Sequence, residues 1–417
     1  MASARLSALA AQLSPNEISA KSKIIEKHPD DVVICGAYRT ALTKGGRGGF
    51  KDTAGADLLV GVLKGLIEKT GVDPKFVEDV CVGNVLAPGS GATEHRAACL
   101  AAGLPYTTAF LAINRQCSSG LMATDHIFRA IATGQIDVGI AGGVESMSNN
   151  YGPGANSPFS DLLTSDSEAA KCLIPMGVTS ENVAEKYGLK RPDLDKFAAT
   201  SYQKAEAAQK AGKFDAEIIP LKVKWSDPKT GDEKEIVVNK DDGIRYGVTA
   251  QSLGGIKPAF KKEGSTHAGN ASQVSDGAAA VLLARRSVAE KLGLPIKGKF
   301  VDCAVAGCPP ELMGIGPAIA IPKVLKKQGL SKDEVDIYEI NEAFASQCVF
   351  SITDCGIDST KVNINGGAIA FGHPLGCTGA RQIATLLSLF DQTGKKVGVT
   401  SMCIGTGMGA ASIIVAE

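Results

Sequence analysis

Two successive series of short β-branched runs alternating with helical patterns constrain the fold of this chain most strongly. In the first series, DVVICGAYRT predicts a strand, GADLLVGVLKGLIEKTG an amphipathic helix and VGIAGGVES a later strand. A Pro-, Gly- and Lys-containing linker, LPIKGK, precedes a second series with the strands FVDCAVAGC, VDIYEI and VNING and the helices GPAIAIPKVLKKQG and TGARQIATLLSLF. This alternation predicts an α/β fold with helices on both faces of a sheet. The repeated order predicts two similar halves.

The domain organisation follows from where the alternation begins, lapses and resumes. A chain of 417 residues is too long for one ordinary core. Between about residues 147 and 275 the pattern lapses into NNYGPGANSP, a long polar helix around residues 193–213 and the charged WSDPKTGDEKE, which indicate an inserted loop region of the kind that carries binding function. We therefore expect a targeting or flexible segment (1–30), a first half (31–146 and 276–294), an inserted loop domain (147–275) and a second half (295–417).

Composition excludes several classes of protein. Lys plus Arg and Asp plus Glu both number 44, so no net field favours nucleic acid or an anionic membrane. The longest uncharged stretch, Val397 to Ala416, contains glycines and two β-rich runs, which favour buried strands joined by a tight loop over a membrane span. Eleven cysteines without paired spacing indicate reduced thiols in an intracellular compartment, and the absence of a CxxC pair argues against zinc.

Two cysteines and one histidine lie among small residues where a substrate could approach the backbone: Cys117 in QCSSG, His373 in GGAIAFGHPLGCTG and Cys403 in SMCIGTGMG. A thiolate is a nucleophile, a neutral imidazole can take its proton, and a second thiol can move another proton. Ser118 or Ser119 is expected to cap the following helix, whose amino terminus would lower the pKa of Cys117. The glycines after Cys403 leave backbone N–H groups free to hold an oxyanion.

Each of these residues has a structural interpretation when it is taken alone. A lone cysteine is usually a small buried hydrophobe, and a histidine between Gly372 and Pro374 is typical of a shaped turn. As a pair, Cys117 and His373 also suit a cysteine hydrolase, although that chemistry gives Cys403 no task. The α/β alternation alone would suit a dinucleotide-binding oxidoreductase, but no GxGxxG follows the first strand.

Four sequence blocks occur in one order: QCSSG, NEAFA from Asn341 to Ala345, GGAIAFGHPLGCTGAR and CIGTGMG. In this order they resemble the active-site blocks of the thiolase family, and the resemblance covers almost the whole chain. KCLIPMGVTSENVAEKYG and the amino terminus are most similar to the peroxisomal 3-ketoacyl-CoA branch of fatty-acid β-oxidation. The resemblance implies a thiolase fold, in which two similar α/β halves stack as a five-layer αβαβα core with an inserted loop domain.

The resemblance also implies roles for particular residues. His373 would take the proton of Cys117, whose thiolate attacks a 3-ketoacyl-CoA, and Cys403 would serve as the second acid and base. Asn341 would hold a water that joins His373 in one oxyanion site, and the backbone N–H groups of Cys117 and Gly405 would form the other. Two further binding residues are implied: Ser272 in HAGNASQVSDGAAA beside the pantetheine of coenzyme A, and Arg245 in IRYG on the adenosine side. Coenzyme A is then a co-substrate, and no permanently bound cofactor or metal is expected.

Partners and location follow from the same resemblance. Acyl-CoA and coenzyme A are the expected small-molecule partners, and a homodimer is the expected assembly. Arg5, Leu6, Gln12 and Leu13 resemble a type 2 peroxisomal signal, which implies an import receptor and a peroxisomal location. Neither nucleic acid nor a membrane span is expected. Two alternatives stay open, an acetoacetyl-CoA thiolase that works in the synthetic direction and a non-catalytic coenzyme A-binding protein.

Overall fold

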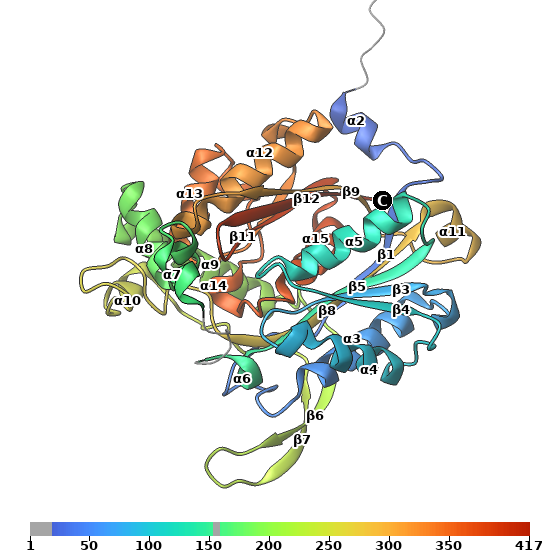
Figure 1. Cartoon of the computed structure of the whole chain (residues 1–417), viewed down its shortest axis with the longest axis horizontal. Coiled ribbons are helices and arrows are strands. Elements are labelled where there is room, and N and C mark those ends of the chain that lie inside the picture. Colours follow the sequence, from blue (N-terminus) through green and yellow to red (C-terminus); the bar gives the residue numbers. More distant parts are fainter. Residues whose placement is uncertain (1–18, 153–158) are drawn as a thin grey trace, which may run out of the picture.

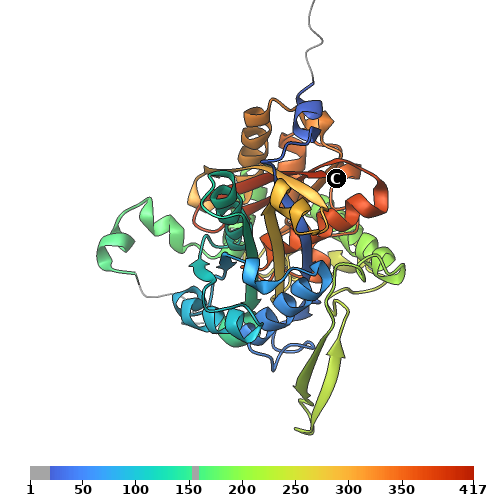
Figure 2. The same ribbon diagram turned by 90° about the vertical axis from the view of Figure 1, so that its right-hand side faces the viewer.

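A computed structural model of the chain describes residues 19–152 and 159–417. The predicted signal residues Arg5, Leu6, Gln12 and Leu13 lie outside this part of the chain. One long mixed sheet forms the framework, and its two ends come from the two halves of the sequence. A separate two-stranded hairpin projects from the body of the molecule (Figures 1 and 2).

The first half of the sheet has the strand order β4-β3-β5-β8-β1. Strand β3 runs parallel to both β4 and β5, whereas β8 runs antiparallel to both β5 and β1. Strands β5 and β8 are buried along almost their whole length, as expected for strands that helices cover on both faces. The bounds are β1 (Val32–Arg39), β3 (Asp79–Gly83), β4 (Ala109–Ile113), β5 (Val138–Ser146) and β8 (Ser275–Arg285).

The second half repeats this order and these directions. Its strands are arranged β10-β11-β12-β9, with β10 parallel to β11 and β12 antiparallel to both β11 and β9. Val362 forms one parallel bridge with Tyr338 of β10, at the place that β4 occupies in the first half. The bounds are β9 (Gly298–Gly307), β10 (Ile337–Ile340), β11 (Val397–Ile404) and β12 (Met408–Ala416).

The prediction of a strand over VNING (362–366) is wrong, because only the single bridge of Val362 forms there. Asn363 has a left-handed backbone with φ 45°, which an extended strand cannot contain. Its side chain takes over the pairing, because Oδ1 accepts from the N–H of Ile340 at 2.9 Å and Nδ2 donates to the carbonyl of Ile340 at 2.9 Å. An asparagine side chain therefore replaces the backbone ladder there.

Three layers of helices alternate with the two half-sheets, so the molecule has five layers (Figure 1). Helices α3 and α4 cover the outer face of the first half-sheet, α5 and α15 lie side by side between the half-sheets, and α12 and α13 cover the second half-sheet. Edge strands β1 and β9 join the halves by antiparallel pairing of Val33 with Lys299 and of Ile34 with Gly298. The predicted α/β fold with two similar halves is confirmed. The bounds are α3 (Gly55–Thr70), α4 (Ala92–Ala101), α5 (Ser119–Ala132), α12 (Gly316–Gln328), α13 (Ala345–Asp354) and α15 (Thr378–Thr393).

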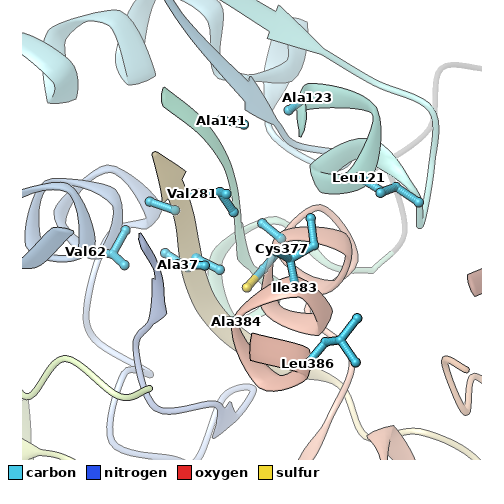
Figure 3. Packing of buried hydrophobic residues seen from close by; sticks show 14 of the residues in the cluster. Ala37, Val62, Leu121, Ala123, Ala141, Val281, Cys377, Ile383, Ala384 and Leu386 are labelled. Atoms are coloured by element: carbon cyan, nitrogen blue, oxygen red, sulfur yellow. The ribbon is translucent and has the colours of Figure 1, made fainter. Parts of the chain in front are cut away.

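The central helix α15 is buried on nearly every side, as a helix between two sheets must be. Figure 3 shows its residues Ile383 and Leu386, and Cys377 directly before it, in the core that also contains Val281 of β8 and Leu121 of α5. Apolar burial at this junction therefore holds both halves together.

The segment between β5 and β8 contains more regular structure than the sequence predicts. The long polar helix is α9 (Arg191–Lys210), with Pro192 in its first turn. WSDPKTGDEKE, expected as a loop, instead lies in the hairpin of β6 (Leu221–Ser226) and β7 (Glu233–Val238), whose turn is closed by a bond from the N–H of Gly231 to the carbonyl of Asp227 at 2.8 Å. The other helices of this segment are α6 (Met147–Asn150), α7 (Asp161–Ser165), α8 (Met176–Lys186) and α10 (Ala250–Gly254).

Strands β11 and β12 form the longest uncharged stretch of the sequence. These two strands pair with each other and are buried, which confirms the interpretation of residues 397–416 as core strands. Within the described residues, no helix combines the length and apolarity that crossing a bilayer requires. The short elements are α2 (Ala20–Ile25), β2 (Thr43–Lys44), α11 (Arg286–Lys291), α14 (Ala368–Phe371) and the 3₁₀ turns η1 (Pro74–Phe76), η2 (Pro88–Gly91), η3 (Ala169–Leu173), η4 (Pro310–Ile315), η5 (Lys332–Glu334) and η6 (Ser359–Lys361).

Candidate active site

The ends of four core elements bring the candidate catalytic residues together. Cys117 precedes α5 and His373 precedes α15, and these two helices are neighbours. Asn341 follows β10 directly, and Cys403 is the penultimate residue of the adjacent strand β11. The N–H of Asn341 donates to the carbonyl of Ser401 at 2.8 Å, which extends the pairing of these strands to the site. The site therefore lies where the two halves meet.

Hydrogen bonds on both ring nitrogens fix the orientation of His373. Nε2 lies 3.3 Å from Asn341 Nδ2, and Nδ1 lies 2.6 Å from Thr378 Oγ1. The Thr378 hydroxyl donates to the carbonyl of Pro374 at 3.3 Å, so it accepts from Nδ1–H. This network leaves the lone pair on Nε2, the nitrogen that faces the asparagine. Burial, and secondarily the charge of Arg381, lower the pKa of His373 to about 3, so the imidazole is neutral.

Cys117 lies in a strained turn and is a protonated thiol in the substrate-free protein. The preceding Gln116 has a φ of 47°, which is uncommon for a residue with a side chain. Burial raises the pKa of Cys117 to about 11, although the backbone N–H groups of Gly405 and of Cys117 itself lie against the sulfur and act in the opposite direction. The nearby carboxylate of Glu145 adds to the increase.

The predicted lowering of the Cys117 pKa by the helix amino terminus is therefore wrong for this state. Neither serine caps α5 with its side chain. The Ser118 hydroxyl donates to the carbonyl of Arg115 at 2.9 Å, and the Ser119 hydroxyl donates to the carbonyl of Gln116 at 2.6 Å. Both hydroxyls thus stabilise the turn that precedes the helix. Desolvation of the sulfur outweighs the hydrogen bonds from the backbone N–H groups of Gly405 and Cys117.

Cys403 is completely buried in a small apolar cluster beside Cys117. Burial raises its pKa well above the ordinary value for a thiol, and the proximity of Cys117 adds to the shift. Met313 and Ala343 share this cluster, with Met176 and Phe344 packed against it. The protein therefore has two neutral thiols near each other, one half-buried and one fully enclosed.

The residues predicted to bind coenzyme A lie on two loops that a glutamine connects. The N–H of Ser272 donates to the carbonyl of Ala343 at 3.0 Å, so Ser272 lies against the NEAFA block. Arg245 is exposed, two residues after Gly243. Gln273 Nε2 donates to the carbonyl of Gly243 at 3.0 Å. One loop thus reaches the buried site while the other reaches the surface.

Asn341 and Glu342 do not cap a helix, because α13 begins three residues after Glu342. Glu342 is instead buried, and it accepts from Ser201 Oγ at 2.6 Å, from Asn363 Nδ2 at 2.8 Å and from the N–H of Ile369 at 3.2 Å. It thereby fixes the segment that leads to His373. Asn341 Oδ1 is buried and has no protein partner within the described chain.

Sequence reasoning missed three residues that shape the site: Thr378, Met176 and Glu145. Thr378 stands five residues after His373 at the start of a predicted helix, a position that could have indicated a contact with the imidazole. Met176 follows Pro175 in a segment used only for its family likeness. Glu145 is the penultimate residue of a predicted strand in a sheet expected to be covered on both faces, where a carboxyl group is itself a signal. No cluster of three or more His, Cys, Asp or Glu side chains suited to a metal occurs in the part of the chain that the structure describes.

Comparison with known proteins identifies the family of the chain. The thiolase N-terminal domain model matches residues 32–287, and the thiolase C-terminal domain model matches residues 294–416. The chain therefore belongs to the thiolase family.

Its similar relatives include proteins named peroxisomal 3-ketoacyl-CoA thiolases. The protein of that name from Yarrowia lipolytica is 64% identical over 413 residues, which cover 99% of this chain and 100% of the relative. A crystal structure of the dimeric peroxisomal thiolase of Saccharomyces cerevisiae has a TM-score of 0.89 and 53% identity, and the match covers 95% of this chain and 100% of that one. The human mitochondrial 3-ketoacyl-CoA thiolase in complex with CoA has a TM-score of 0.83 and 36% identity, with 93% of this chain and 98% of that one covered.

Proposed function

We propose that this protein is a peroxisomal 3-ketoacyl-CoA thiolase that uses coenzyme A to cleave 3-ketoacyl-CoA into acetyl-CoA and an acyl-CoA two carbons shorter, in fatty-acid β-oxidation. The observation that carries this function is the second thiol, Cys403, which is buried and close enough to Cys117 for that residue to raise its pKa. A hydrolase needs only a nucleophile and a base, whereas carbon–carbon cleavage also needs an acid for the departing carbanion.

The first half-reaction forms an acyl-enzyme. His373 Nε2 takes the proton of Cys117, and the resulting thiolate attacks the 3-keto carbon. The bond between carbons two and three then breaks, and the thiol of Cys403 protonates carbon two to release acetyl-CoA. Two donors, the N–H groups of Cys117 and Gly405, lie against the Cys117 sulfur, where they suit the oxygen of a carbonyl bonded to it.

The second half-reaction transfers the acyl group to coenzyme A. The Cys403 thiolate takes the proton of incoming coenzyme A, whose thiolate attacks the acyl carbon. Cys117 departs as a thiolate and recovers its proton from His373. Asn341, whose Nδ2 lies 3.3 Å from His373 Nε2, holds a water that completes a second oxyanion site with the imidazole. The neutral tautomer of His373 supports this scheme, because Nε2 then carries the lone pair that can accept a proton.

Binding of coenzyme A is proposed at Ser272 and Arg245, as a co-substrate with no permanently bound cofactor. Ser272 lies against the NEAFA block beside Cys403, which suits the reactive end of the pantetheine. Arg245 is exposed at the far end of the same pair of loops, where a guanidinium suits the phosphates and adenosine. We propose that these loops belong to an inserted loop domain (147–275) between a first half (31–146 and 276–294) and a second half (295–417).

Assembly as a homodimer is proposed from the exposed edge strand β4 and from the dimeric relative of Saccharomyces cerevisiae. Among the described residues no strand pairs with the outer edge of β4, and Tyr106 beside it is 85% exposed. A second copy would cover the unpaired N–H and C=O groups of this edge strand, which otherwise promote aggregation. We also propose that residues 1–30 contain the peroxisomal signal (Arg5, Leu6, Gln12, Leu13) and bind an import receptor.

Thiolysis of a chain-length series of 3-ketoacyl-CoAs tests the function. We expect turnover of several chain lengths, with a loss of at least about a thousandfold in Cys117→Ala and in Cys403→Ala. Cys355→Ala is the matched control, since this half-buried cysteine at the end of α13 has no proposed role. Activity confined to the four-carbon substrate would overturn the broad β-oxidation function. Full activity of Cys403→Ala would overturn the mechanism.

A further inference from the structure

The loop that carries His373 packs against the first half of the molecule through direct contacts between backbones. A Cβ on Gly376 would lie 2.8 Å from the carbonyl oxygen of Gly83 and 2.8 Å from Cα of Asn84. A Cβ on Gly120 would lie 2.6 Å from the carbonyl oxygen of Gly376, and one on Gly143 would meet the same oxygen. Glycine is therefore required on both sides of this junction. Gly120 is three residues after Cys117 and Gly376 is three residues after His373, so the junction sets these two loops against each other.

Glu145 lies at this junction and has no role in the proposed mechanism. It is the penultimate residue of β5, it is completely buried, and its carboxylate accepts from the N–H groups of Val85 at 3.1 Å and Leu86 at 3.1 Å. It also accepts from the N–H of Gly376 at 3.0 Å and from Asn84 Nδ2 at 3.2 Å. One buried carboxylate thus connects the segment after β3 to the His373 loop. Four donors converge on it, and the residues it bonds include no cation.

We propose that Glu145 is a positioning residue of the reaction, whose ionised carboxylate holds the His373 loop in register with Cys117. A carboxylate can accept all four of these bonds, because it offers about four lone-pair positions and no donor. A protonated carboxyl group would present a hydrogen to a cluster of N–H donors. At least one donor would then lose its partner in a buried site, and the contact with Gly376 would weaken. Alignment of the base with the nucleophile, and with it turnover, therefore depends on the charge of Glu145.

The charge of Glu145 changes near neutral pH. Burial raises its pKa to about 7, against the opposing effect of the four hydrogen bonds. The groups that face it are Cys117 before α5 and Cys377 before α15, and burial raises the pKa of both thiols, to about 11 and about 12, so both stay neutral in this range. On the neighbouring strand β8, Asp276 bonds instead to Ser148. Since only the ionised form aligns the loops, activity should decrease as the pH decreases through about 7.

The pH profile of thiolysis tests this proposal with Glu145→Gln, a neutral variant of the same shape. We expect kcat to fall about tenfold or more, with KM changed less than about threefold, because a misaligned base weakens the transition state more than substrate binding. We also expect the acid limb near pH 7 to disappear. Glu78→Gln is the control, because Glu78 accepts from the N–H groups of Asp137 and Val138 at the opposite end of β3 and β5.

An unchanged acid limb in a folded Glu145→Gln protein would overturn the proposal. If that variant does not fold, Asn84→Ala is the deciding test. This variant removes one donor to the Glu145 carboxylate, so it should move the midpoint of the acid limb to higher pH. An unmoved midpoint would contradict the role of Glu145. The inference rests on the proposed roles of Cys117 and His373, and turnover by Cys117→Ala would refute those roles whatever the Glu145 variants do.

Discussion

At the scale of single residues, Cys117 and His373 form a pair in which both members are neutral before substrate binds. Burial raises the pKa of the thiol to about 11 and lowers that of the imidazole to about 3. A thiolate–imidazolium pair is therefore disfavoured in the empty site. In the proposed mechanism substrate binding supplies the stabilisation, because the proposed oxyanion donors act on charge that develops only during the reaction.

Alkylation of Cys117 by iodoacetamide in the free enzyme should reveal this neutral state. Because the reactive species is the thiolate, we expect the rate to rise about tenfold per pH unit from pH 7 to about 10, well below the pKa. The measurement is labelling followed by peptide mapping at Cys117. A rate that is already at its plateau at pH 7 would show instead that the helix amino terminus ionises the thiol.

Replacement of Thr378 should affect the chemistry more than the fold. Thr378→Val removes the acceptor of the His373 Nδ1–H and leaves a buried donor unpaired, which costs about 1–3 kcal/mol. We expect kcat to fall by about tenfold, with little change in KM. Thr378→Ser keeps the hydroxyl and should restore most of the activity. Equal kcat in the Val and Ser variants would show that the tautomer does not depend on this bond.

At the scale of elements, helix α15 organises the site. Its residue Gln382 donates through Nε2 to the carbonyl of Glu339 at 2.8 Å and to the carbonyl of Ser401 at 3.2 Å. Those residues lie two positions before Asn341 and Cys403. One helix therefore holds the two strands that carry these side chains, while its first residue, Thr378, holds His373.

The insertion is tied to the core by a buried ion cluster. Asp241 accepts from Nη1 and Nη2 of Arg39 at 2.7 and 2.9 Å, and Glu217 accepts from Nε at 2.6 Å. Asp241→Asn leaves the Arg39 charge only partly compensated in a site without solvent, so we expect a loss of about 3 kcal/mol in the free energy of unfolding. Urea denaturation measures it. Asp333→Asn, which disrupts an exposed pair with Lys332, should change the same free energy by less than about 0.5 kcal/mol.

The elements show where sequence reasoning succeeds and where it fails. Strands such as β5 and β12 were predictable because their apolar residues are continuous and their ends carry glycine or polar residues. The strand over VNING failed because Asn363 pairs through its side chain, which no periodicity shows. Cys117, His373 and Cys403 could be found from their blocks. The pKa of Cys117 could not, because it depends on how deeply the folded chain buries the sulfur.

At the scale of the whole molecule, the two halves share one strand order and meet at the site. Each half supplies part of the proposed chemistry: Cys117 comes from the first, and Asn341, His373 and Cys403 come from the second. Neither half alone can therefore assemble the site. The domain division proposed above is consistent with this dependence. The insertion contacts the segment before His373, where Gln273 Nε2 donates to the carbonyl of Ala370 at 2.9 Å, but it contributes none of the four groups proposed to react.

The projecting hairpin has a consequence for how unfolding is observed. The single tryptophan of the chain, Trp225, lies on β6 between Lys51 and Lys234, whose Nζ atoms lie 4.9 and 4.8 Å from its ring centre. A peripheral two-stranded hairpin has little core of its own and is expected to open before the main sheet. Tryptophan emission should therefore change at a lower urea concentration than far-ultraviolet circular dichroism and enzymatic activity, which should decay together. Three superimposable curves would mean that the hairpin unfolds with the core. If the curves separate as expected, the intrinsic fluorescence of this enzyme is a local probe of one ribbon rather than a measure of global stability.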